Sequence, residues 1–143
     1  MNGRPEVAAE ILAKLRAICL GLPEAREETA WAGTRWCVAK KNFAHVIAVD
    51  DGWPPAYAEA ARDDGPITVL TFRLPIARIE APKFRREPYF KPVWFADILG
   101  LRLAPDADWD EIEELLVESY CVLAPRKLAA LVRPACPPSR RRP

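Results

Sequence analysis

Two short segments of the chain place cations directly beside an aromatic ring. The first segment reads Lys40-Lys41-Asn42-Phe43, and the second reads Lys83-Phe84-Arg85-Arg86. Lysine and arginine side chains bind phosphate groups, and an aromatic ring can stack on a nucleobase or wedge between two bases. Both segments therefore have the chemistry of a nucleic-acid-binding surface. Lysines at hairpin tips are also common on soluble proteins in general, so the segments alone do not decide the function.

The charges around these segments are segregated along the chain, although the net charge is only +1. Basic residues predominate between Ile67 and Ala104, acidic residues crowd the stretch from Asp106 to Glu118, and every charge after Pro125 is positive. A folded domain with this pattern can present one basic and one acidic face. The candidate nucleic-acid contacts are therefore Lys40, Lys41, Phe43, Arg73, Lys83, Arg85 and Arg86.

The residue inventory does not support a catalytic or metal site. His45 is the one histidine, and it lies in a strand pattern that favours a structural role. The four cysteines are scattered without a Cys-x-x-Cys pair, which argues against zinc. The acidic pairs at 50–51 and 63–64 stand beside glycine and proline, where turn formation explains them. We expect no catalytic residues, no metal, no cofactor and no enzymatic activity.

The length of 143 residues fits one domain, which we expect to span residues 1–134. Residues 135–143 are rich in proline and arginine and are predicted to form a disordered tail. No stretch approaches the roughly 20 apolar residues of a membrane span, and the N-terminus has no apolar core of the signal-peptide kind. We therefore expect a cytoplasmic protein with no membrane partner.

Apolar periodicity predicts the elements that must position these side chains. Helices are predicted at 5–20 and from Asp108 to Pro125, where Asp108 can cap the helix and Glu111 can reach back to the cap, followed by a short helix. Residues 56–62 can form helical turns or a loop, and the polar residues 23–29 are predicted as a loop. Strands are predicted at 34–39, 44–50, 67–74 and 93–103, with a turn at 40–42 and an irregular, proline-rich segment at 76–92.

Strands joined by tight turns form an antiparallel sheet, and the amphipathic helices near both ends of the chain need an apolar face to cover. The expected fold is therefore α+β in two layers, with the N- and C-terminal helices on one face of the sheet.

Four segments of the chain resemble the MmcQ/YjbR family in order and spacing. They are Leu22-Pro23-Glu24-Ala25, the hairpin from Trp36 to Ala44, the helix from Trp109 to Leu116, and Glu118-Ser119-Tyr120 with its continuation to Leu128. The resemblance implies a small α+β domain with a fold similar to a double-wing domain. The family is commonly described as DNA-binding, and the lysine and phenylalanine of its hairpin match Lys41 and Phe43. The resemblance supplies no catalytic residues and no cofactor.

The leading hypothesis is a DNA-binding domain that contacts phosphates through the basic hairpin. The alternative is a module that binds a protein or a small ligand through a surface rich in tryptophan and proline near Trp53 or Trp94. DNA and another protein are therefore the two candidate partners.

Overall fold

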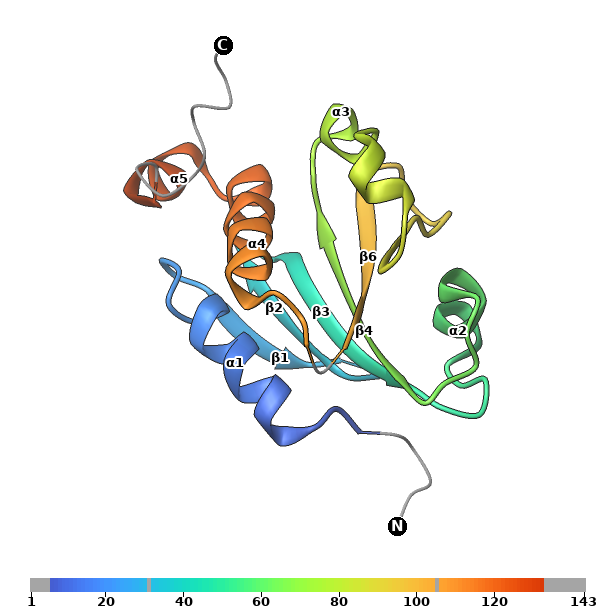
Figure 1. Ribbon diagram of the computed structural model, residues 1–143. Helices are drawn as coiled ribbons and strands as arrows, with labels where there is room; N and C mark the ends of the chain where they lie inside the picture. The colour runs from blue at the N-terminus through green and yellow to red at the C-terminus, as the bar shows by residue number, and fades with distance from the viewer. Residues whose placement is uncertain (1–5, 31, 105, 133–143) are drawn as a thin grey trace.

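The fold is α+β, as the sequence predicts, and a six-stranded antiparallel sheet forms its centre (Figure 1). The computed structural model describes residues 6–30, 32–104 and 106–132, so the predicted tail at 135–143 lies outside the described residues. The strands lie in the order β1-β2-β3-β4-β6-β5. Their bounds are β1 Arg26–Thr29, β2 Thr34–Val38, β3 Lys41–Val49, β4 Ile67–Arg73, β5 Tyr89–Phe90 and β6 Ile98–Leu103.

The helices cover the two faces of the sheet unequally. On one face α1 and α4 lie side by side over the larger core, which includes Trp36, Leu70 and Leu116, each with no exposed surface (Figure 1). On the other face α2 packs over a smaller core around Ile47 and Val69. The bounds are α1 Ala9–Cys19, α2 Pro55–Ala61, α3 Ile76–Ile79, the 3₁₀ helix η1 Pro82–Arg85, α4 Trp109–Leu123 and α5 Arg126–Val132.

Helix α4 confirms the predicted capping residue. The Asp108 carboxylate accepts hydrogen bonds from the backbone N–H groups of Asp110 and Glu111, which satisfies two donors of the first turn. The predicted return contact from Glu111 is replaced by an ion pair between this carboxylate and Lys83 of η1. Asp108 therefore caps the start of α4, and the ion pair of Glu111 with Lys83 connects η1 to α4.

Strand β1 corrects the prediction of a loop at 23–29. Its sequence, Arg-Glu-Glu-Thr, has neither the apolar alternation nor the β-branched content of a typical strand. It is nevertheless paired with β2 along its whole length, with Glu27 opposite Trp36 and Glu28 opposite Arg35. Because β1 is an edge strand, charged side chains are tolerated there and discourage pairing with another chain.

The turn between β2 and β3 is one residue earlier than predicted. Val38 pairs with Lys41, so Ala39 and Lys40 form a two-residue turn, with φ angles of 50° and 67°. Positive φ at both central residues is the geometry of a type I′ hairpin turn. Asn42, which was predicted in the turn, lies in β3, and its side-chain oxygen accepts a hydrogen bond from the Ala44 N–H.

This turn predicts a stabilising substitution. Alanine strongly disfavours positive φ, whereas asparagine is favoured at the first position of a type I′ turn. We expect Ala39→Asn to raise the free energy of unfolding by about 0.5–1 kcal/mol in urea denaturation. The control is Ala56→Asn on an exposed turn of α2, which is expected to lower stability because asparagine is a poor helix former. Loss of stability in Ala39→Asn would contradict the assigned turn.

Side chains of the segments that carry the family resemblance contact one another around α4. Ser119 has no exposed surface; its hydroxyl donates to the Phe43 carbonyl oxygen and accepts from the Arg73 N–H. The Tyr120 hydroxyl donates to the Pro23 carbonyl oxygen at 2.7 Å, and the Tyr120 ring lies perpendicular to the Phe43 ring. These contacts fasten the hairpin and the chain before β1 to α4, so these residues have a structural role in this domain.

His45 has a structural position on the face covered by α2. Its Nε2 lies 2.7 Å from the Ala32 carbonyl oxygen, which can only accept, so Nε2 carries the proton. Nδ1 then accepts from the Tyr57 hydroxyl at 3.1 Å. Burial lowers the pKa of His45.

The lowered pKa predicts how stability depends on pH. Between the folded pKa and the unfolded value of about 6.5, the unfolded chain binds more protons at this position, so stability falls as pH falls through that window. We expect His45→Gln to reduce this dependence in denaturation curves at pH 7.5 and 5.5. Because the chain has one histidine, its imidazole NMR signals report the pKa directly. A folded-state pKa above 6.5 would contradict the assignment.

Candidate functional site

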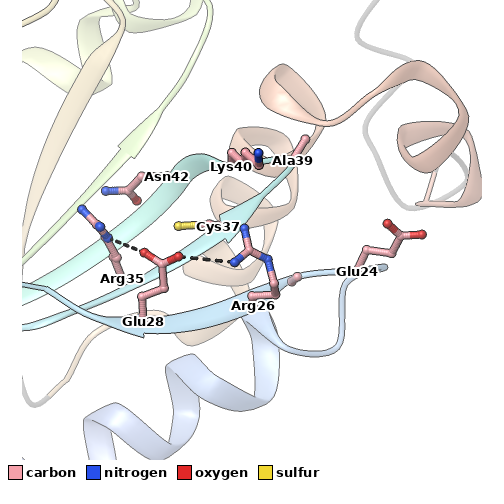
Figure 2. Close-up of a pocket in the computed structure, with 9 residues that line it drawn as sticks. Glu24, Arg26, Glu28, Arg35, Cys37, Ala39, Lys40 and Asn42 are labelled. Carbon is pink, nitrogen blue, oxygen red and sulfur yellow. Dashed lines mark hydrogen bonds and ion pairs between the residues drawn. The ribbon is translucent and has the colours of Figure 1, made fainter.

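The sheet leaves a hollow of about 840 Å³ on the face opposite α1 and α4, at the end formed by the β2–β3 turn. Figure 2 shows its side chains, which come from the segment before β1, from β1 and β2, from the turn and from the first residues of β3. Side chains alternate between the two faces of each strand. Trp36 points into the larger core and donates a 2.9 Å hydrogen bond to Glu27, so the neighbours of these two residues along β1 and β2 point into the hollow. The charged or polar lining residues are Glu24, Arg26, Glu28, Arg35, Cys37, Lys40 and Asn42.

A carboxylate bridges the two arginines of this hollow. Glu28 accepts from Arg35 at 3.0 Å and from Arg26 at 3.3 Å (Figure 2). The Arg35 guanidinium is the main reason why the pKa of Glu28 lies below its usual range. Both guanidinium groups therefore already have an internal partner, and an external anion must compete with Glu28 for them.

Cys37 lies in the hollow but has the properties of a packed thiol. Only 4% of its surface is exposed, and burial raises the pKa of the thiol, with a further contribution from the Glu28 charge. A nucleophilic cysteine needs a lowered pKa, usually from a neighbouring cation or helix N-terminus. Burial and Glu28 together outweigh the neighbouring Arg35 and Arg26 guanidinium groups, so the pKa of Cys37 is shifted in the opposite direction to that of a nucleophilic cysteine.

Lys40 and Lys41 are the exposed cations of the hairpin. Lys40 lines the hollow, and Lys41 begins β3. In the described part of the chain, neither lysine lies within ion-pair distance of a carboxylate. Both ammonium groups are therefore available to an external phosphate.

Helix α5 adds two cations at the same end of the molecule. The contacts of Ser119 and Tyr120 with Phe43 place the last turn of α4 beside the start of β3. Arg126 and Lys127 follow at the first positions of α5, and both are exposed. We call Lys40, Lys41, Arg126 and Lys127 the hairpin-end cations.

Phe43 corrects the prediction of a base-stacking ring. It has no exposed surface and packs against Tyr120, with ring centroids 5.5 Å apart. The physical reason is an irregularity in the β2–β3 pairing: Trp36 pairs with Ala44 and Cys37 with Asn42, so Phe43 is an extra residue in β3. Because of this bulge, the Phe43 side chain points into the core instead of toward solvent, and it is not accessible to a ligand.

Arg73 and Lys83 are held by partners within the domain. Arg73 pairs with Asp97 at 2.7 Å, and its guanidinium lies over the Phe95 ring. Lys83 pairs with Glu111. Both cations therefore differ from the hairpin lysines, because a phosphate must displace an internal carboxylate to bind them.

Arg85 and Arg86 are exposed but lie in a different part of the molecule from the hairpin. They belong to or follow η1, which contacts β5 at the far edge of the sheet. Three strand positions separate β3 from β5, or roughly 14 Å at the usual strand spacing. The predicted contacts therefore form two groups and not one continuous surface.

Four cations at this end of the molecule were not predicted. Arg26 and Arg35 line the hollow and are paired with Glu28, whereas Arg126 and Lys127 are exposed. Arg26 was assigned to a loop because β1 has no strand pattern, and Arg126 and Lys127 are distant in sequence from the hairpin. Arg35 carried a usable signal, because it alternates with the apolar Trp36 in a predicted strand and so points away from the core.

The two tryptophans named in the alternative hypothesis, Trp53 and Trp94, are half-buried. Trp94 packs against Tyr57 with ring centroids 4.8 Å apart, and Trp53 packs against the smaller core. The exposed apolar side chains of this region are Val93, with 93% of its surface exposed, and Phe95, with 58%. The most exposed apolar side chains of this region are therefore the two sequence neighbours of Trp94.

Within residues 6–30, 32–104 and 106–132 there is neither a cluster of metal ligands nor a helix that could span a membrane. No group of three or more His, Cys, Asp or Glu side chains is placed to hold a metal ion. No helix there has the length and apolarity needed to cross a membrane.

Comparison with known proteins supports the fold but names no activity. No protein-family model matches the chain, and no curated protein matches it. Among solved structures, the chain is similar to a crystal structure of a protein from Pseudomonas syringae, with a TM-score of 0.56 and 12% sequence identity. The match covers 79% of this chain and 96% of that one. At this identity the similarity shows a shared fold.

Proposed function

We propose that this domain binds DNA through the phosphate backbone, without catalysing a reaction, and that the hairpin-end cations form the contact surface. The observation that carries the proposal is that four exposed cations, none with a carboxylate partner in the described ranges, lie together at one end of the molecule. Seven other cations have an internal carboxylate partner. The partnered cations are Arg16, Arg26, Arg35, Arg73, Arg78, Lys83 and Arg102. The resemblance to the MmcQ/YjbR family points to the same function.

The geometry also limits the kind of recognition we propose. Phosphate contacts position a protein on DNA, whereas reading the sequence requires contacts to base edges or stacking on bases. The one aromatic ring of the hairpin segment, Phe43, is buried and unavailable for stacking. We therefore expect weak binding with little sequence preference.

The test is fluorescence anisotropy of two labelled duplexes of unrelated sequence, titrated with the protein at 50 and 200 mM salt. Contacts from four cations predict a slope of about −3.6 for the logarithm of affinity against the logarithm of salt, which weakens binding roughly a hundredfold over this range. The two duplexes should bind with similar affinity. The proposal would be refuted by a lack of binding at 50 mM salt, or by an affinity that is the same at both salt concentrations.

A further inference from the structure

A second pocket, of about 510 Å³, lies among α3, η1, β5 and the segment at 91–96. Its floor is formed by buried apolar and aromatic side chains. Ile79, Phe84 and Tyr89 expose 8% of their surface or less, and the Phe84 and Tyr89 rings lie perpendicular with centroids 4.8 Å apart. Ile76 lies at the rim with 52% of its surface exposed. The volume is within the usual range for small-molecule sites.

One cation of this pocket is held in a fixed position. The Lys91 ammonium donates to the carbonyl oxygens of Pro92 and Phe95, both at 2.6 Å, which closes the segment at 91–95 into a loop. An ammonium has three N–H donors, so one remains for a ligand. No carboxylate in the described ranges lies within ion-pair distance of Lys91.

The charges of the lining favour an anion. Arg85 and Lys91 are its two cations, and Glu80 is its one carboxylate. Burial lowers the pKa of Lys91, and the negative charge of Asp97 offsets this effect only in part, so the ammonium is partly removed from water. A ligand carboxylate placed at the free N–H would compensate for that loss of hydration.

We propose that this pocket binds a small organic acid, in which one carboxylate is attached to an aromatic or branched apolar body. The apolar floor accommodates the body, and Lys91 and Arg85 bind the carboxylate at the rim. The charges of Arg85, Lys91 and Glu80 sum to +1, which suits a monoanion better than the dianion of a phosphate ester. The inference uses none of the hairpin-end cations and is independent of DNA binding.

The test uses phenylacetate and its uncharged amide, phenylacetamide, as probes that differ mainly in charge. Both are titrated into ¹⁵N-labelled protein, and chemical-shift changes are followed by NMR. We expect saturable shifts for phenylacetate at residues 76–96 and binding of the amide that is weaker by about tenfold or more. Equal affinity for the two probes, or phenylacetate shifts centred elsewhere, would overturn the proposal.

Three variants test the pocket itself. Ala96 is an exposed lining residue, so Ala96→Trp fills the space without entering the core and should abolish binding. Lys91→Met should weaken phenylacetate binding but leave phenylacetamide binding unchanged, whereas Lys127→Met, the same change on α5, should alter neither. Undiminished binding by folded Ala96→Trp would overturn the proposal. The proposal would also be overturned if a peptide ending in phenylalanine bound to the pocket and phenylacetate did not, because the ligand would then be a peptide.

Discussion

The double substitution Lys40→Glu and Lys41→Glu is expected to weaken binding to duplex DNA by roughly tenfold or more at 50 mM salt. Each reversal removes one phosphate contact and places a negative charge where the backbone of DNA approaches. The slope of affinity against salt should also become shallower by about 1.8, because two of the four contacts are lost. Both side chains are exposed and at the hairpin tip, so the fold should tolerate the change.

The matched control for this result is Arg85→Glu with Arg86→Glu. It produces the same change in net charge at two exposed residues beside η1, on the far side of the sheet. We expect a loss of affinity several times smaller than that of the hairpin variant, since only the long-range field changes. Equal losses in the two double variants would show that net charge, and not the hairpin end, determines binding.

Replacement of Ser119 by alanine is expected to lower the free energy of unfolding by about 2–3 kcal/mol. The hydroxyl has no exposed surface and makes two short hydrogen bonds, donating to Phe43 O at 2.6 Å and accepting from Arg73 N at 2.8 Å. Alanine leaves one buried acceptor and one buried donor without their partner. The measurement is urea denaturation of the variant and the native sequence.

The neighbouring substitution Glu118→Ala controls for a general effect on α4. Glu118 pairs with Arg78 at the surface, and exposed ion pairs contribute little to stability. We expect a change within about 0.5 kcal/mol. A Ser119→Ala variant as stable as Glu118→Ala would mean that the hydroxyl does not fasten β3 and β4 to α4.

The elements with strong apolar periodicity were predictable from the sequence. Helix α4 has its capping residue at Asp108, and β4 occupies residues 67–73 of the predicted strand at 67–74. The segment at 93–103 is only partly a strand, because β6 begins at Ile98. Strand β1 could not be predicted, because pairing with β2 and not its own composition makes it a strand.

The candidate site was less predictable than the fold, because its properties depend on contacts between distant residues. Lys40 and Lys41 were chosen as candidates from their own types and position, and both are exposed at the hairpin end. The partners that hold Arg73 and Lys83 lie 24 and 28 residues away, at Asp97 and Glu111, and no local pattern links them. The inward turn of Phe43 depends on one extra residue in β3, which shifts the alternation in a way that periodicity does not reveal.

The most direct measurement is NMR mapping of the surface that contacts DNA. A short duplex is titrated into ¹⁵N-labelled protein at 50 mM salt, and the amide shifts are followed residue by residue. We expect the largest changes at residues 38–42 and 126–128, with small changes at 82–90. Changes centred on 82–90, or no changes at any residue, would contradict the proposal that the hairpin end binds DNA.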